Sequence, residues 1–388
     1  MMKQTGDLTL VKKMNTAIVL DAVLRYAPLS RAQISERTGL NKATVSSLVQ
    51  DLIDSHLVAD IGPGESSGGR KPNLLEFRSR SGYAVGIDLG VNYIRGILTD
   101  LEGSVVAERR ITLRTQDADS VIAQLFDCIE ALRSEIPACP YGMVGIGIGV
   151  PGLVNAEGTI LFAPNLSWPE VPLRALAEER FGVPVTIDNE ANAGAQGEQR
   201  YGAGRGIANQ IYVSVGIGIG TGMILNKELY KGAGGFSGEL GHLSIHADGK
   251  PCRCGNQGCW ELYASENALL EQAAPLGYHD LDSLLDAARG GEAEVVALFA
   301  GIGEALGVGI ANIVNVFNPD VVIVGNVMRR AEAWIGDAMQ RTVARRALKH
   351  HRGKLSVLFA EQGEKSAVRG AAYYAISAFL AKMKGSGV

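Results

Sequence analysis

The chain has 388 residues, of which 46% are hydrophobic and 20% charged, and its formal net charge is −4. This length predicts two or three domains, and the apolar fraction is ordinary for a soluble globular protein with a large core. No apolar run of signal-peptide or membrane-spanning length begins the chain, which argues against the secreted and membrane classes and favours a cytoplasmic location. The net charge by itself does not suggest a nucleic-acid partner.

Charge is unevenly distributed along the chain. Residues 1–80 carry 11 Lys and Arg against 8 Asp and Glu, whereas the remaining residues carry 26 against 33. A weakly basic head therefore precedes an acidic body, and the asymmetry directs attention to the motifs of the head.

The first eighty residues contain the pattern of a helix-turn-helix. Apolar residues at helical spacing predict an amphipathic helix over residues 9–26. Ser30 is placed to cap a second helix that ends at Thr38, Gly39 makes a tight turn, and Asn41 caps a third helix. The apolar face of the third helix consists of Val45, Leu48, Val49, Leu52 and Ile53. Two short helices around a glycine turn, after a packing helix, are typical of this motif.

Two short strands around a polar tip follow the third helix and indicate a wing. Residues 57–61 and 74–77 flank the segment GPGESSGGRKP. Its basic pair, Arg70 and Lys71, could enter a DNA minor groove or bind phosphates. The outer face of the third helix carries short polar side chains suited to base edges. The predicted DNA contacts are Arg31, Lys42, Thr44, Ser46, Ser47, Gln50, Arg70 and Lys71. We expect a winged helix-turn-helix DNA-binding domain over residues 1–80; a generic helical cap with a linker loop is the alternative.

The body contains two similar glycine-turned hairpins. One begins at Tyr83 with the letters YAVGIDLG, and the other begins at Ile211 with IYVSVGIGIGTG. A further buried strand follows each copy, at residues 144–150 and 321–325, and helical stretches lie between them. The repetition predicts two α/β lobes with a ligand cleft between them. We expect residues 81–193, with a C-terminal helix at 371–388, in the first lobe and residues 194–370 in the second.

Three of the five cysteines lie within one short segment. His242, Cys252, Cys254 and Cys259 supply one imidazole and three thiols, a complete tetrahedral ligand set for Zn²⁺ with no open position for a catalytic water. The site would therefore be structural. The alternatives are a chance cluster or a redox pair. Free cysteines beside such a site suit a reducing compartment.

Six motifs of the chain are informative together: GIDLG, GVPG, DNEAN, GELGH, CRCGNQGCWE and NVFNPD. They resemble the ROK family of repressors, open reading frames and sugar kinases, and the likeness spans residues 10–375. The pairing of GELGH with CxCGxxGCxE is highly specific. The resemblance implies an α/β body of two actin/hexokinase-like lobes with a sugar cleft, behind the winged helix-turn-helix head. It also implies six sugar contacts: Asn165, Asn189, Glu190, Glu239, His242 and Glu261. Trp168 either stacks on a sugar face or plugs the loop.

Two departures from the family pattern argue against a kinase. The kinases of this family place an Asp after the Asn as the base for the attacking hydroxyl, whereas Glu190 follows Asn189 here. A displacement of about 1 Å at a catalytic group costs about 100-fold in rate, so Glu190 weakens phosphoryl transfer without excluding it. Their phosphate turn carries small residues and a Thr after Asp-x-Gly, whereas a β-branched Val91 follows Gly90 here and the Thr hydroxyl is absent. No catalytic residue is therefore expected.

These features predict a repressor of a sugar-utilisation operon that is released from palindromic operator DNA when a monosaccharide binds. The likeness of the head and of the first hairpin points to D-xylose as the effector. The cysteine cluster predicts structural Zn²⁺ as the cofactor, and operator binding predicts a homodimer or higher homo-oligomer without a membrane partner. Three alternatives stay open: a sugar kinase with an accessory DNA-binding head, a sugar-dependent activator, and a head that binds a partner protein.

Overall fold

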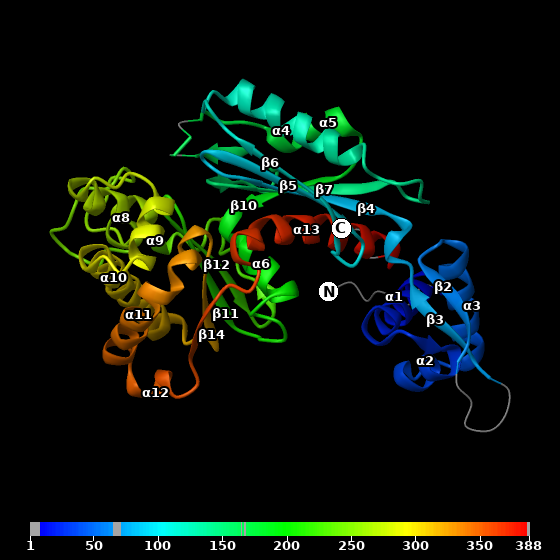
Figure 1. The fold of residues 1–388 in the computed structure, drawn as a ribbon. Helices are drawn as coiled ribbons and strands as arrows, with labels where there is room; N and C mark the ends of the chain where they lie inside the picture. Colours follow the sequence, from blue (N-terminus) through cyan, green and yellow to red (C-terminus); the bar gives the residue numbers. More distant parts are fainter. Residues whose placement is uncertain (1–7, 65–70, 164, 167, 386–388) are drawn as a thin grey trace.

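The computed structural model describes residues 8–64, 71–163, 165–166 and 168–385 of the chain. The N-terminal head is a three-helix unit with a small antiparallel sheet, seen in blue in Figure 1. Its elements are α1 (Leu8–Tyr26), β1 (Leu29–Ser30), α2 (Arg31–Thr38), α3 (Lys42–Asp54), β2 (Val58–Pro63) and β3 (Asn73–Phe77). The sheet has the order β1-β3-β2, and β2 and β3 form the wing.

Side-chain caps fix the ends of the two short helices of the head. Ser30 and Gln33 form a capping box, in which each side chain accepts a hydrogen bond from the backbone N–H of the other residue. The Asn41 side chain accepts from the Thr44 N–H at 2.8 Å. Gly39 ends α2 in the left-handed region, at φ 73°, which costs glycine little. The helices therefore begin and end where the sequence predicts.

Two five-stranded sheets form the body and share one strand order. The first runs β6-β5-β4-β7-β10 and the second β13-β12-β11-β14-β15; each combines three antiparallel strands with two parallel ones. The first sheet comprises β4 (Tyr83–Leu89), β5 (Tyr93–Asp100), β6 (Val105–Thr112), β7 (Met143–Val150) and β10 (Val185–Asn189). The second comprises β11 (Gln210–Val215), β12 (Ile219–Leu225), β13 (Glu228–Leu229), β14 (Val321–Gly325) and β15 (Ser356–Phe359). The shared order confirms the predicted duplication.

Helices α6 (Glu190–Tyr201) and α13 (Ser366–Met383) pack together between the two sheets (Figure 1). Their contact with each other and with the first sheet is unusually close. A Cβ added at Gly147 in β7 would lie 1.8 Å from the carbonyl oxygen of Ala371, and one added at Gly370 would lie 1.7 Å from that of Ala193. Only glycine permits such an approach. The outer face of the first sheet carries α4 (Ala118–Arg133) and α5 (Leu173–Phe181), and a small hairpin, β8 (Leu153–Val154) with β9 (Ile160–Phe162), lies at its edge.

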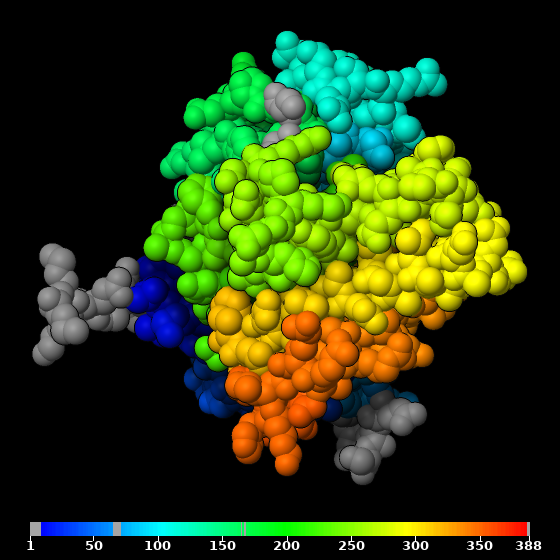
Figure 2. Space-filling view, turned by 90° about the vertical axis from the view of Figure 1, so that its left-hand side faces the viewer, coloured from blue at the N-terminus to red at the C-terminus, as the bar shows by residue number. Residues whose placement is uncertain are grey.

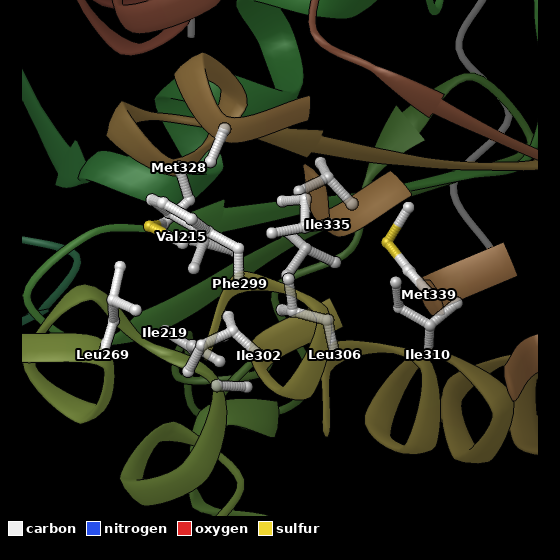
Figure 3. Close-up of a cluster of buried hydrophobic side chains, with 14 of the residues drawn as sticks. Val215, Ile219, Leu269, Phe299, Ile302, Leu306, Ile310, Met328, Ile335 and Met339 are labelled. Carbon is white, nitrogen blue, oxygen red and sulfur yellow. The ribbon is translucent and has the colours of Figure 1, made fainter. Parts of the chain in front are cut away.

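The second sheet is covered on its outer face by the remaining helices. These are α7 (Glu261–Ala264), α8 (Glu266–Ala273), α9 (Leu281–Arg289), α10 (Ala293–Phe317), α11 (Glu332–Arg346) and α12 (Lys349–Arg352). Figure 3 shows apolar side chains of α10, among them Phe299, Leu306 and Ile310, facing Ile335 and Met339 of α11 in one buried cluster. Burying each such side chain contributes about 1.5–3 kcal/mol. Among the described residues α10 is the one helix long and apolar enough to cross a bilayer, and half of that apolar stretch is buried in the lobe.

The head rests on the C-terminal half of α13. Ala375 and Ile376 belong to the same buried cluster as the apolar core of the head. Lys384 Nζ lies 2.6 Å from Asp21 Oδ1 of α1, and the Tyr141 hydroxyl donates to the Ser55 carbonyl oxygen at the end of α3. One helix therefore touches the head at its end and the body along its length. The proposed division of the chain at residues 80 and 193 stays a prediction.

Candidate functional site

A cavity of about 660 Å³ opens between the two sheets, where the carboxyl ends of β4, β7, β10, β11 and β14 converge. Its size is that of a small-molecule site, and strand ends of this kind are where α/β sheets bind ligands. All six residues predicted to bind a sugar line it: Asn165, Asn189, Glu190, Glu239, His242 and Glu261. Residues nearly one hundred positions apart in the sequence therefore meet at one place, although sugar binding itself stays a prediction.

Asn189 and Glu190 are held at the junction of β10 and α6. The Asn189 side chain caps α6 by accepting from the Ala191 N–H at 2.8 Å, and it donates to the Gly152 carbonyl oxygen at 3.1 Å. One amide hydrogen and one oxygen lone pair remain for a ligand, because an amide offers two donors and two acceptor sites. Asn189 therefore has both a structural and a ligand-facing part.

Glu190 is the first residue of α6 and stands in a short chain of hydrogen bonds. Ser214 donates to its Oε2 at 3.2 Å, and Asn326 Nδ2 donates to the Ser214 hydroxyl at 2.9 Å. Burial, reinforced by the negative charge of Asp88, raises the pKa of Glu190 to about 8. At neutral pH this carboxyl is mostly protonated, so it can donate a hydrogen bond to a ligand as well as accept one.

Glu239, His242 and Glu261 form the opposite wall of the cavity. Burial raises the pKa of Glu239 above its ordinary value, an effect that Glu261 reinforces and His242 opposes. His242 Nδ1 lies 3.4 Å from Glu261 Oε1, and Glu261 Oε2 points to Gly218, where an added Cβ would lie 2.7 Å away. Glu261 thus links the cysteine cluster to the glycine-rich turn of the cavity.

The cysteine cluster has the composition and spacing of a four-coordinate metal site. The Sγ atoms of Cys252, Cys254 and Cys259 and one ring nitrogen of His242 all lie within 4.8 Å of one another. Cys254 Sγ is 3.7 Å from Cys259 Sγ, and Cys252 Sγ is 3.7 Å from His242 Nδ1. A tetrahedron with metal–sulfur bonds of about 2.3 Å has edges of roughly 3.8 Å, so the donor set fits. The three thiols are free.

The loop around this cluster is shaped by its own backbone. The Cys252 N–H donates to the Asn256 carbonyl oxygen at 2.8 Å, and Asn256 Nδ2 donates to the His242 carbonyl oxygen at 3.2 Å. Gly258 has φ 68° and an added Cβ would lie 1.7 Å from the His246 carbonyl oxygen, so the turn requires glycine. These bonds orient the ligands before any ion binds, as the outer contacts of metal sites commonly do.

Tyr93 fills the turn after Asp88, a feature that the sequence did not reveal. Its hydroxyl donates to Asp88 Oδ2 at 2.9 Å, and its ring lies over Gly90, where an added Cβ would be 2.3 Å from a ring carbon. Burial raises the pKa of Asp88 to about 6 despite this hydrogen bond. Arg95 and Arg110 flank the ring at 5.6 Å. An aromatic ring therefore occupies the space beside this turn.

The far end of the cavity is predominantly acidic. Its carboxylates are Asp88, Glu266, Asp280, Asp282 and Glu364, and its cations are Arg110 and Arg330. Arg330 is paired with Asp282 and lies 4.0 Å from Glu364, and Glu364 also pairs with the buried Arg95 at 2.8 Å. Among the described residues Glu266 and Asp280 have no ion pair, and such carboxylates repel an anionic ligand, so this end does not favour a polyphosphate. Apart from Asp88 of the GIDLG motif, no sequence motif marks these residues; they come from β4, β6, α8, α9 and its N-cap, and the loops after β14 and β15.

The sequence pattern of the ROK family matches residues 84–378. The chain is a member of the ROK family. It is 43% identical over 379 residues to the protein named xylose repressor from Bacillus subtilis (strain 168), across 97% of this chain and 98% of that protein. A crystal structure of a ROK family transcriptional regulator, a homologue of the E. coli MLC protein, matches with a TM-score of 0.81 and 26% identity over 96% of this chain and 98% of that one.

A ROK glucokinase from Streptomyces griseus, in complex with glucose and AMPPNP, also shares the fold. Its TM-score is 0.68 and its identity 31%, over 75% of this chain and 98% of the kinase. The regulator's coverage of 96% extends into the head, whereas the family pattern begins only at residue 84. The two-lobed ROK body behind a helix-turn-helix head is therefore the observed architecture, as the sequence predicts.

The Trp168 side chain packs in the protein core and does not stack on a ligand. It is 6% exposed and belongs to the core of the first lobe, and its Nε1 donates to the Gln116 carbonyl oxygen at 2.7 Å. A buried indole with its N–H satisfied has no free face toward the cavity. Of the two readings of Trp168, packing is the correct one.

The predicted DNA-contacting residues lie on two surfaces of the head. Lys42, Ser46, Ser47 and Gln50 are exposed on α3 and Thr44 is half-buried there, while Lys71 is exposed beside β3 and Arg70 lies outside the described residues. Gln50 donates to Asp54 at 2.9 Å, so it must release this bond to reach a base. Arg31 lies 3.8 Å from Asp60 on the wing, an ion pair that orients its guanidinium along the α2–wing edge.

Proposed function

We propose that the chain is a sugar-responsive transcriptional repressor, in which a monosaccharide in the cavity of the ROK body weakens operator binding by the head. The observation that carries the proposal is that one chain holds both a polar recognition helix and a cavity lined by six amide, carboxylate and imidazole side chains. The Bacillus subtilis relative, which matches 97% of this chain, is named xylose repressor, and this name supports the combination of a DNA-binding head and a sugar site in one chain. Operator DNA as the partner agrees with the cytoplasmic location expected from the sequence.

D-xylose is the proposed effector. Carboxylates and amides pair well with vicinal hydroxyls, because each side chain accepts or donates two hydrogen bonds. The protonated Glu190 can bind a hydroxyl oxygen, whereas the opposite wall with Glu239 and Glu261 supplies acceptors. A site built in this way discriminates strongly against an analogue that lacks one hydroxyl, because its own polar groups would stay unpaired.

Zn²⁺ is the proposed structural ion, held by His242, Cys252, Cys254 and Cys259. Three thiolates and one imidazole complete a tetrahedral shell, so the ion would act through structure. With Nδ1 of His242 directed to the thiols, the other ring nitrogen is left to carry the proton and donate toward the cavity. Glu261 Oε1 lies 3.4 Å from the Cys252 sulfur and 3.4 Å from His242 Nδ1, so this carboxylate stands directly beside two of the proposed ligands.

Sugar phosphorylation is the less favoured activity of this body. The Tyr93 ring occupies the turn after Asp88, and the adjoining end of the cavity is acidic. A nucleotide triphosphate would meet both a steric obstacle and like charge there. Because a ROK glucokinase shares the fold, an ATP-coupled assay with D-xylose and glucose is the direct check; robust turnover would reject a purely regulatory role.

Packing indicates how a bound sugar would reach the head. Helix α6 begins at Glu190 in the cavity and packs on α13, and α13 carries the head at its other end. A sugar that binds the closed lobes better than the open ones shifts the equilibrium between them, and a tenfold shift needs about 1.4 kcal/mol. In a homodimer on a palindromic operator the two heads must span half-sites about 34–36 Å apart, so a small rotation of each head prevents simultaneous docking.

The test is a DNA selection followed by sugar titrations on the full-length protein. Operator sequences are first selected from a randomised duplex library, and a palindromic consensus is expected from a homodimer. D-xylose, glucose and N-acetylglucosamine are then added to the protein–DNA complex while fluorescence anisotropy reports release. D-xylose is expected to weaken binding at least tenfold, with the other two sugars weaker. Tighter binding with sugar would reassign the protein as an activator, and no selected DNA would reject the operator role.

A further inference from the structure

Residues 230–238 form a compact loop between β13 and the cavity-lining Glu239. The Ser237 N–H donates to the Lys231 carbonyl oxygen at 3.1 Å, and the Ser237 hydroxyl donates to the Tyr230 carbonyl oxygen at 2.8 Å. These two bonds close the loop on itself. Figure 2 shows this part of the chain at the surface, in yellow-green, next to the green and cyan atoms of the first lobe.

One long side chain connects this loop to the other lobe. Lys231 Nζ lies 2.7 Å from Asp188 Oδ2, at the end of β10 in the first sheet. The Lys231 side chain is 45% exposed, whereas that of Asp188 is only 6% exposed. The other carboxylate oxygen, Oδ1, accepts from the Asn189 N–H at 2.8 Å and from Asn192 Nδ2 at 3.0 Å. The neutral Tyr374 hydroxyl also lies beside this carboxylate, but no hydrogen bond of regular geometry from a described residue reaches Oδ2, so the ammonium is the charge that compensates it.

The same pair lies beside two of the residues predicted to bind a sugar. Asn189 directly follows Asp188, and Glu239 directly follows the loop. Asp188, Asn189 and Glu239, together with Phe236 of the loop, line one small hollow between the lobes. The position of the loop therefore sets the distance between the Asn189 wall and the Glu239 wall of the cavity.

We propose that Lys231 is a positioning residue for sugar binding, and that its ion pair with Asp188 clasps loop 230–238 of the second lobe to the first lobe beside the cavity. This inference rests on the proposed function and names a residue that sets the affinity for the sugar without touching it. Without the ammonium the loop loses its charged link, and Asp188 keeps a buried charge without compensation. The lobes then open more readily and Glu239 is displaced from Asn189.

The size of the effect follows from the exposure of the pair. A fully exposed ion pair contributes little, but here one partner is buried, and removing the other leaves a buried charge. We expect Lys231→Met to weaken D-xylose binding about tenfold, which corresponds to about 1.4 kcal/mol. Lys231→Arg keeps the charge and should stay within threefold of the wild type.

Calorimetry with D-xylose on the full-length protein tests the clasp through a double-mutant cycle. Asp188→Asn removes the charge that Lys231 compensates, so Lys231→Met should weaken binding much less in that background than in the wild type. Lys227→Met is the matched control, because Lys227 is exposed on the turn between β12 and β13 of the same hairpin. The proposal is overturned if Lys231→Met binds within twofold of the wild type, if Arg does not restore binding, or if the two single losses multiply in the double variant.

Hydrogen exchange of the sugar-free protein separates failure of the clasp from failure of the proposed function. The backbone amides of residues 230–238 should exchange at least fivefold faster in Lys231→Met than in the wild type. In Lys227→Met their exchange rates should equal those of the wild type. If the wild type binds no monosaccharide, the proposed function fails while faster exchange still establishes the clasp. Unchanged exchange in Lys231→Met refutes the clasp whatever the sugar result.

Discussion

Glu190→Gln tests the protonation state on which the sugar site depends. Burial raises the pKa of Glu190 from 4.5 to about 8, so the folded protein holds a proton there that the unfolded chain releases above about pH 4.5. As pH rises from 4.5 toward 8, the unfolded state binds fewer protons than the folded state, and Glu190 progressively destabilises the fold. Gln carries no ionisable proton, so the variant escapes this pH dependence.

The magnitude follows from the size of the shift. Between pH 5 and pH 8, a carboxyl whose pKa moves from 4.5 to about 8 costs the fold roughly 3 kcal/mol, at about 1.4 kcal/mol per unit. The melting temperature of Glu190→Gln relative to the wild type should therefore rise by about 4 °C from pH 5 to pH 8.

Scanning calorimetry of both proteins at pH 5, 6.5 and 8 provides the measurement. Asp88, whose pKa is raised to about 6, contributes to the slope in both proteins, so the difference between them reports Glu190 together with its coupling to Asp88. Gln also keeps an acceptor for Ser214, and its D-xylose affinity at pH 7 should stay within about threefold of the wild type, whereas Glu190→Ala should lose tenfold or more. A melting-temperature difference that is constant across this pH range would mean that Glu190 is ionised throughout, and would refute the reasoning.

Three further variants test the metal cluster, the wing and the packing of α13. Cys254→Ser should lose the bound metal, as measured by elemental analysis, and should have a lower melting temperature than the wild type. Cys139→Ser is the control; it lies far from the cluster in sequence and should keep the metal. If both variants retain the metal, the ligand set is wrong. Lys71→Ala should reduce the slope of log affinity against log salt by about 1 on operator DNA and leave sugar affinity unchanged, with the exposed Lys349→Ala as control. An unaltered slope would remove Lys71 from the interface. Gly370→Ala should destabilise the fold by about 3 kcal/mol in denaturant unfolding, because its added Cβ would meet the Ala193 carbonyl oxygen. The control is Gly301→Ala in α10, whose added Cβ meets nothing, and it should be neutral or slightly stabilising. Equal stability of the two variants would contradict the α6–α13 contact.

Local chemistry made much of this protein predictable from its sequence. The caps at Ser30 and Asn41 act within three residues of themselves, so the helices of the head follow from the letters alone. The cysteine spacing is likewise local, because residues 252–259 turn back on themselves through their own backbone bonds. The repeated glycine-turned hairpins predicted two related lobes, and both sheets have the same strand order. Resemblance to the family then named six cavity residues, and all six line one cavity.

Other decisive features depend on contacts between distant parts of the chain, which only the tertiary structure could place. Periodicity gave no reason for the Tyr93 ring to close over Gly90, and a Trp in a Pro-rich loop was equally compatible with stacking or packing until Trp168 was found in the core. The ion pair of Lys231 with Asp188 joins residues more than forty positions apart, and α13 meets α1 across most of the chain. Such contacts follow from how two lobes and a head pack, since a side chain's partner there is set by the assembled shape and not by its neighbours in sequence. The sequence alone determined which groups could bind DNA, metal and sugar; packing decided which of them share a cavity and how that cavity is connected to the head.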